Sequence, residues 1–173
     1  MDYCSCLCKL DRCGCDDGSW DAELKFPFDV KKISGRFGTL SEFRKAKGLQ
    51  PHSGVDWAMP VGTPIPALDK GTIVLNQESK VLGHVVVLRV MAFDPTGDKT
   101  KKEIFYIGYC HLKEPGLAVD TKVAEGDIIG KVGNTGSASS GPHLHLTVSK
   151  ELKGVFGPTS VKQDPIEFIK ANK

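Results

Sequence analysis

The stretch Gly141-Pro-His-Leu-His-Leu-Thr-Val148 alternates polar and apolar side chains from its first histidine onward. Successive side chains of a β-strand point to opposite faces, so the two histidines and Thr147 are expected to share one face and the leucines and Val148 the other. The apolar face would pack on a core. The polar face would hold His143 and His145 about 6–7 Å apart, close enough to serve one metal site. Two solvated histidines on a half-buried strand are the alternative.

Other segments extend this β pattern. Strands are predicted where β-branched and aromatic residues gather, at 71–76, 84–93 and 103–112. A tight strand–turn–strand is predicted at 123–133, which has glycines at its corners. Helix is suggested only at 41–47 and 165–171, the latter with Asp164 as N-cap and Pro165 in the first turn. We expect a mainly β fold, a small antiparallel β-sheet or barrel-sandwich domain with a groove over the sheet and a short C-terminal helix.

The composition excludes some classes of function. The chain has 173 residues, which suits one domain plus a short appendage. Its 23 Lys and Arg against 21 Asp and Glu leave no basic excess for nucleic-acid binding. No apolar run approaches the roughly 20 residues that span a bilayer. The first 20 residues lack the apolar region of a secretory signal. We therefore expect synthesis in the cytoplasm without membrane insertion or standard secretion.

Residues 1–20 form a separate block that holds five of the six cysteines, namely Cys4, Cys6, Cys8, Cys13 and Cys15. The block has too few apolar residues to fold without a staple or a docking surface. Its thiolates could hold a second zinc ion or an iron–sulfur cluster, form disulfides, or remain reduced. The chain is thus divided into a Cys-rich segment, 1–20, and a body, 21–173. Cys110 is either a partner for the odd thiol or a small core residue.

A second histidine pattern is His52-Ser-Gly-Val-Asp56. Its histidine and carboxylate can converge on one point if the chain bends at Gly54, and both groups are ordinary zinc ligands. The third pattern is Tyr109-Cys-His-Leu112, which closes a predicted strand. Strict alternation would place Tyr109 and His111 on one face, looking into a common groove, with Cys110 pointing away from them. A lone strand histidine is more often structural, so each pattern is weak alone.

In their order and spacing, these patterns resemble the LytM/lysostaphin family of zinc endopeptidases, which cut peptide cross-links in bacterial peptidoglycan. The resemblance covers about residues 33–150, and its longest match runs from Ile129 to Leu146. It implies one catalytic zinc ion, and the implied ligands are His52, Asp56 and His145. It also implies that His111 and His143 act on the water and on the tetrahedral intermediate, in an order that the sequence leaves open. Tyr109 is a candidate for the substrate groove, and His84 a structural or groove-edge residue.

The resemblance implies an endopeptidase whose partner is the peptidoglycan peptide. The family divides between enzymes that cut D-Ala–diaminopimelate cross-links and enzymes that cut oligoglycine bridges, and we favour the first. We interpret the chain as phage-encoded and carried in a virion, at a tail tip or baseplate, with residues 1–20 binding tail proteins. One alternative is a structural tail subunit whose peptidase activity is secondary. The others are a free glycyl-glycine-type lysin and inhibition of the zinc site by the N-terminal thiolates.

Overall fold

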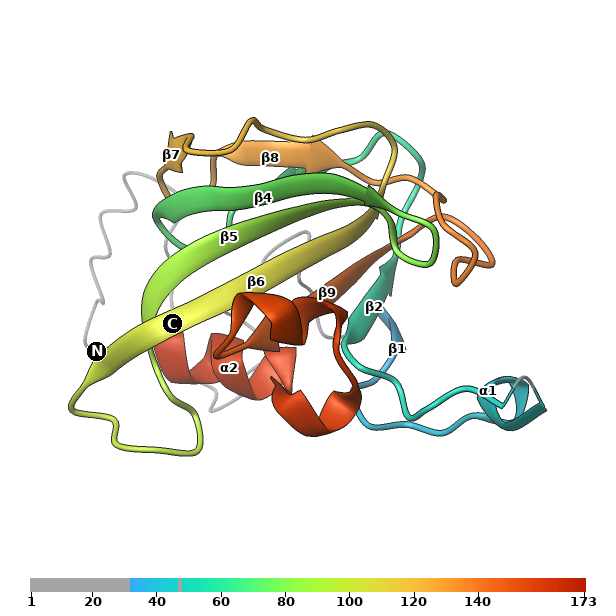
Figure 1. Ribbon diagram of the computed structural model, residues 1–173, viewed down its shortest axis with the longest axis horizontal. Helices are drawn as coiled ribbons and strands as arrows, with labels where there is room; N and C mark the ends of the chain where they lie inside the picture. Colours follow the sequence, from blue (N-terminus) through green and yellow to red (C-terminus); the bar gives the residue numbers. More distant parts are fainter. Residues whose placement is uncertain (1–31, 47) are drawn as a thin grey trace, which may run out of the picture.

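The computed structural model describes residues 32–46 and 48–173. Within them the elements follow one another as shown in Figure 1: β1 (Ile33–Gly35), α1 (Glu42–Ala46), β2 (Val55–Ala58), β3 (Pro64–Pro66), β4 (Gly71–Ser79), β5 (Gly83–Phe93), β6 (Lys102–Leu112), β7 (Lys122–Val123), β8 (Ile128–Lys131), β9 (His143–Ser149), the 3-10 helices η3 (Leu152–Phe156) and η4 (Thr159–Val161), β10 (Lys162–Gln163) and α2 (Pro165–Asn172).

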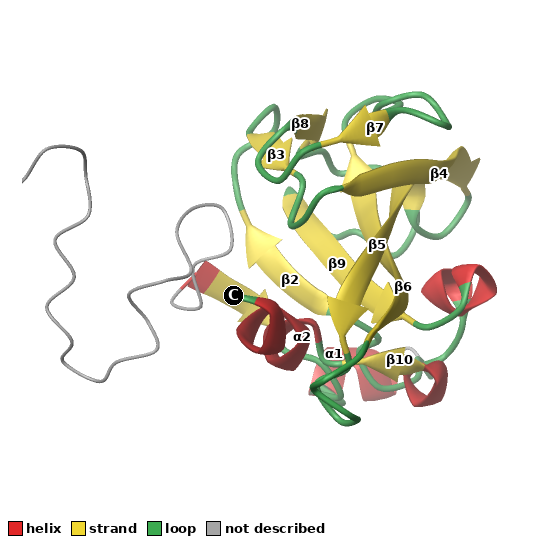
Figure 2. Ribbon diagram, turned by 90° about the vertical axis from the view of Figure 1, so that its left-hand side faces the viewer, coloured by secondary structure: helices red, strands yellow, loops and turns green. Residues whose placement is uncertain are grey.

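The strands form two antiparallel sheets. The large sheet has the order β1-β2-β9-β6-β5-β4-β7, with β10 paired to β9, and the small sheet consists of β3 and β8. In Figure 2 the small sheet lies beside one end of the large one, and α2 lies at the opposite end. The predicted mainly β, antiparallel fold is confirmed. The strands predicted at 71–76, 84–93 and 103–112 correspond to β4, β5 and β6.

The main core covers one face of the large sheet. It contains Leu144, Leu146 and Val148 of β9, as the alternation predicts, together with residues of the small sheet and of α2. Phe105 of β6 and Phe168 of α2 stack with ring centroids 5.1 Å apart. A second, smaller apolar cluster lies under η3 and contains Val85, Val87, Cys110 and Val155. Cys110 of this cluster pairs with His145 of β9, so the second cluster lies on the polar face of β9, the face of the candidate site.

The helices agree with the sequence. α1 and α2 fall at the two predicted positions, and the Asp164 side chain caps α2 by accepting a hydrogen bond from the Ile166 N–H at 2.8 Å. The strand–turn–strand predicted at 123–133 is present as β7, a turn and β8, but the two strands do not pair with each other, because β7 pairs with β4 and β8 pairs with β3. The short 3-10 helices η3 and η4 were not predicted, since turns of this length leave no periodic pattern.

A β-bulge in β6 shapes the candidate site. Between two register pairs β5 advances from His84 to Val86, while β6 moves back from Leu112 to Tyr109, so β6 contains one extra residue there. His111 in this bulge has a φ of 59°, in the left-handed region that non-glycine residues seldom adopt. Bulges near active sites re-aim a side chain. The bulge therefore releases His111 from the strict alternation of the strand.

One set of predictions concerns residues that the structure does not describe. The segment 1–20, with Cys4, Cys6, Cys8, Cys13 and Cys15, lies outside the described residues, so its metal, disulfide and docking roles stay predictions. Among the described residues, none of the helices has the length and apolarity that crossing a bilayer requires.

Candidate metal centre

Three predicted ligands converge on one point. The Nδ1 atom of His145 lies 2.8 Å from Oδ1 of Asp56 and 3.1 Å from Nε2 of His52. The same Nε2 atom lies 3.2 Å from Oδ2 of Asp56. These three residues are the group of potential ligands found among the described side chains. The structure thus brings together all three residues for which a zinc-binding role was implied.

The large sheet fixes two of the three ligands. Asp56 and His145 are direct neighbours across the antiparallel pair β2–β9, and paired side chains of neighbouring strands point to the same face. His52 comes from the irregular segment before β2, and its backbone N–H donates to the Thr39 carbonyl while its own carbonyl accepts from the Gly38 N–H, both at 2.8 Å. Two rigid ligands therefore meet one that is held by loop contacts.

Hydrogen bonds select the ring nitrogens that face the site. The Nδ1 atom of His52 lies 3.1 Å from the Arg36 carbonyl oxygen, which can only accept, so Nδ1 carries the proton and Nε2 is free to bind a metal. His145 faces the site with Nδ1. Its Nε2 is buried and has no hydrogen-bond partner among the described residues. Such outer contacts set the tautomer of a metal-binding histidine.

Burial and neighbouring charges shift the pKa values of Asp56 and His145 toward the protonation states that bind a cation. Burial would raise the pKa of the Asp56 carboxyl, but hydrogen bonds and charge from His145 and His52 hold it well below its usual range. Burial is the largest influence on His145 and lowers its pKa to about 4, although its hydrogen bond to Asp56 opposes the shift. The centre therefore presents a carboxylate and a neutral imidazole at neutral pH, which are the forms that bind metal.

The donor set fits zinc. Zn²⁺ binds imidazole nitrogen and carboxylate oxygen at about 2.0–2.2 Å in tetrahedral geometry, which places neighbouring ligand atoms a little over 3 Å apart. The three separations in this chain are 2.8, 3.1 and 3.2 Å. Three protein ligands, with a fourth position for water or substrate, characterise catalytic rather than structural zinc sites.

The two remaining site histidines lie beside this centre. The His111 ring centroid is 4.7 Å from that of His143 and 5.8 Å from that of His145. Nδ1 of His111 donates to the Thr135 carbonyl at 2.6 Å, and Nδ1 of His143 donates to the Gly141 carbonyl at 2.7 Å. The Nε2 atom of each ring is therefore free to accept or donate a proton. Nε2 of His143 lies 3.7 Å from Asp56 Oδ1. Burial lowers the pKa of His111, which favours its neutral form.

The position of Tyr109 differs from the prediction that it lines the substrate groove. It is fully buried in the main core opposite Leu146, and its hydroxyl accepts a hydrogen bond from the Leu68 N–H at 3.0 Å. It therefore does not line a substrate groove. The expectation that Tyr109 and His111 share a face is wrong because the bulge in β6 turns His111 to the opposite face.

The orientation of Cys110 also differs from the prediction. It is the direct cross-strand neighbour of His145, so it lies on the face of the metal centre rather than away from it. The thiol is fully buried, and burial raises its pKa to about 12. It is a free cysteine that packs with Val85 and Val155, as expected for a small core residue. Its high pKa makes it a poor metal ligand.

The backbone carbonyl groups of Arg36, Thr135 and Gly141 orient the histidines and were not predicted. Backbone acceptors leave no signature in side-chain patterns, although the glycine and proline before His143 mark an irregular turn. His84 is half-buried at the start of β5 and its N–H donates to the Thr135 hydroxyl at 3.1 Å, which agrees with a structural role.

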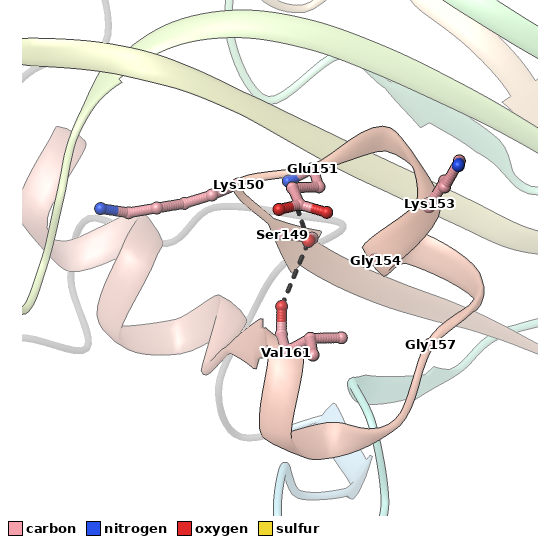
Figure 3. A pocket seen from close by; sticks show the side chains of 7 residues that line it. All are labelled: Ser149, Lys150, Glu151, Lys153, Gly154, Gly157 and Val161. Atoms are coloured by element: carbon pink, nitrogen blue, oxygen red, sulfur yellow. Dashed lines mark hydrogen bonds between the residues drawn. The ribbon is translucent and has the colours of Figure 1, made fainter.

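A pocket elsewhere in the chain offers no comparable chemistry. Residues between Ser149 and Val161 line it, and Figure 3 shows the Lys150 and Lys153 side chains pointing away from each other. Lys150 is paired with Asp94 at 2.5 Å and with Glu103 at 2.8 Å. None of the predicted site residues lines this pocket.

Comparison with known proteins finds that this chain is similar to peptidases. Residues 50–158 match the family described as peptidase family M23. The peptidoglycan DD-endopeptidase ShyA of Vibrio cholerae is 30% identical over 149 residues, which cover 86% of this chain and 29% of that protein. The catalytic domain of the antimicrobial peptidase lysostaphin from Staphylococcus simulans is 29% identical, with a TM-score of 0.61 over 80% of this chain and 92% of that domain.

A further solved structure with the same fold is the catalytic domain of EnpA, a prophage-encoded M23 protein of Enterococcus faecalis. It is 28% identical, and the match covers 78% of this chain and 88% of that one with a TM-score of 0.58. The chain spans about a third or less of the length of the curated relatives it matches. The likeness therefore concerns the peptidase domain.

Proposed function

The chain belongs to peptidase family M23, and we propose that it is a zinc-dependent endopeptidase that hydrolyses peptide cross-links of bacterial peptidoglycan. The observation that carries the proposal is the convergence of His52 Nε2, Asp56 and His145 Nδ1 at 2.8–3.2 Å, with the rings of His111 and His143 beside them. ShyA, a peptidoglycan endopeptidase by name, supports the substrate class.

The three ligands would hold the zinc ion. A bound zinc ion supplies Lewis-acid chemistry, polarising the scissile carbonyl and lowering the pKa of water. Asp56 contributes the negative charge that offsets part of the ion's charge, and the β2–β9 pair holds it rigidly against His145. The hydrogen bond from His52 to the Arg36 carbonyl keeps Nε2 of that ring directed at the centre.

His111 and His143 would move protons. The carbonyls of Thr135 and Gly141 fix the proton of each ring on Nδ1, so each ring exchanges protons at Nε2. One ring takes a proton from the attacking water and passes it to the leaving amine, work that typically contributes 10²–10⁴-fold to the rate. The other, when protonated, donates a hydrogen bond to the oxygen that gains negative charge.

For the bond cleaved, we propose the direct D,D cross-link, which the name of ShyA supports. The likeness to lysostaphin keeps oligoglycine bridges as the second candidate. The test is mass spectrometry of fragments released from defined sacculi of each cross-link type, with and without a chelator. Chelator-sensitive release from directly cross-linked sacculi supports the proposal, whereas release from oligoglycine sacculi alone would overturn the choice of bond.

We also propose that the chain acts on the cell wall as part of a phage virion, with residues 1–20 binding tail proteins. A prophage-encoded relative, EnpA, favours this origin. Mass spectrometry of particles purified from an induced culture tests the proposal. Peptides of this chain within the particles would support it. Peptides only in the particle-free lysate would instead support a free lysin.

A further inference from the structure

We propose that Lys162 and Thr159 are positioning residues for the ligand His52, a role that rests on the zinc-dependent function proposed above. Both residues lie after position 158, where the match to the peptidase family ends. They contact the two neighbours of His52 in the sequence, Pro51 on one side and Ser53 on the other.

The segment that carries His52 has no strand partner. Residues 50–53 lie between α1 and β2, so no ladder of backbone hydrogen bonds fixes them. Contacts from elsewhere take that role. The Gln50 carbonyl accepts from the Arg44 guanidinium at 2.8 Å, and the Pro51 carbonyl accepts from the Thr159 hydroxyl at 2.7 Å. The Thr159 side chain, which is 108 residues from Pro51, thus supplements the backbone bonds of His52 to Gly38 and Thr39 and the bond of its ring to the Arg36 carbonyl.

Lys162 connects this segment to the strand of the other histidine ligand. It lies in β10, directly opposite Ser149 of β9, and β9 also carries His145. Next to it, the Ser149 hydroxyl donates to the Val161 carbonyl at 3.2 Å, the bond drawn in Figure 3. The Lys162 ammonium then donates to the Ser53 hydroxyl at 3.2 Å. Lys162 thus links β9 to the chain between His52 and Gly54.

The contact to Ser53 also bears on His145. A Cβ atom built on Gly54 would lie 2.3 Å from the Leu146 carbonyl oxygen and 2.8 Å from Cε1 of His145. The chain therefore passes directly against the ring of the second ligand. A displacement of Ser53 would move His52 and release the packing against His145 at the same time.

Stability does not account for the presence of Lys162, because burying its ammonium group is unfavourable. It is half-buried, no carboxylate among the described residues forms an ion pair with it, and burial lowers its pKa to about 8. An uncompensated buried charge destabilises a fold. Replacing it with Met should therefore leave the metal-free fold as stable or make it more stable, whereas a positioning role predicts weaker zinc binding.

The experiment measures zinc dissociation constants by competition with a chromogenic chelator, and thermal unfolding of the metal-free protein, for the full chain and its variants. Lys162→Met, Thr159→Val and Ser53→Ala should each weaken zinc binding, by about tenfold for the lysine, as for other residues that orient metal ligands. Unfolding of metal-free Lys162→Met should occur at an unchanged or higher temperature. Adding Ser53→Ala to Lys162→Met should weaken binding no further.

Lys153→Met is the matched control, because Lys153 is exposed in η3 of the same region and should leave zinc binding unchanged. Equal affinity in wild type and Lys162→Met would overturn the inference. Tighter zinc binding by Lys162→Met would also overturn it, because it would show that the ammonium acts on the metal only through its positive charge. A loss of metal-free stability in parallel with the loss of zinc affinity would overturn it as well, because it would show a purely structural role. A wild-type chain that binds no zinc would overturn the proposed function as well.

Discussion

Asp56 and His145 lie directly opposite each other on β2 and β9, and Oδ1 of Asp56 is 2.8 Å from Nδ1 of His145. Because both side chains rise from the same hydrogen-bonded strand pair, neither can move far without the other. The sheet thereby fixes two of the three ligands of the metal centre before any ion binds. The third ligand, His52, lies in an irregular segment outside this strand pair, so its position can adjust to the ion.

Substitutions should separate metal binding from catalysis. His145→Ala and Asp56→Ala should lose both zinc and cleavage of sacculi, because each removes a ligand. His111→Ala and His143→Ala should retain stoichiometric zinc and lose about 10²-fold or more in rate. Elemental analysis and release of soluble peptides from sacculi check this prediction. Full activity in either of the latter two variants would contradict the assigned roles.

Removing the metal should lower stability. A ligand that binds only the folded state stabilises it by about 2.7 kcal/mol at a concentration 100 times its dissociation constant. Metal-free protein should therefore unfold at a lower urea concentration than protein in excess zinc. The His145→Ala variant should show no such difference, and a zinc response in that variant would argue against the site.

The metal-free protein should lose stability as the pH falls. Burial lowers the pKa of His145 to about 4, below the 6.5 of an exposed imidazole, so between these values the unfolded chain binds more protons. The contribution of His145 is full above about pH 6.5 and is lost toward pH 4, on the order of 3 kcal/mol over that range. Urea unfolding at pH 7.0, 5.5 and 4.5 should show a shallower loss for His145→Gln.

Tyr109→Phe should affect stability but not catalysis. The Tyr109 hydroxyl accepts the buried Leu68 N–H, and leaving that donor unpaired costs about 1–3 kcal/mol. Because the ring lies in the main core, the KM and kcat of the variant should match wild type at a temperature where both are folded. A changed KM with unchanged stability would instead indicate that Tyr109 lines the substrate groove.

Gly54→Ala should disturb the centre through packing. The new methyl would meet the Leu146 carbonyl and the His145 ring, so we expect a loss of about 2–4 kcal/mol in stability together with weaker zinc binding. Gly141→Ala is the control, since a Cβ there meets nothing within 4 Å. Equal thermal unfolding of the two variants would show that the chain at Gly54 relaxes freely.

The sequence predicted much of this arrangement, because much of it follows from local rules. Alternation along residues 143–148 correctly assigned the leucines to the core and His145 to the opposite face. The spacing between His52 and Asp56 also sufficed, since two residues four positions apart can reach one ion when the chain bends between them. The short C-terminal helix followed from Asp164 and Pro165, whose effects act within one turn.

Only the tertiary structure decided the rest. Tyr109 lies in the core and His111 in the site because β6 contains one extra residue opposite β5, and no property of either residue specifies that bulge. Likewise, the contacts of Thr159 and Lys162 with the His52 segment join residues more than 100 positions apart. Sequence patterns report periodicity within one element, whereas register between strands and bonds between distant segments arise only when the whole chain packs.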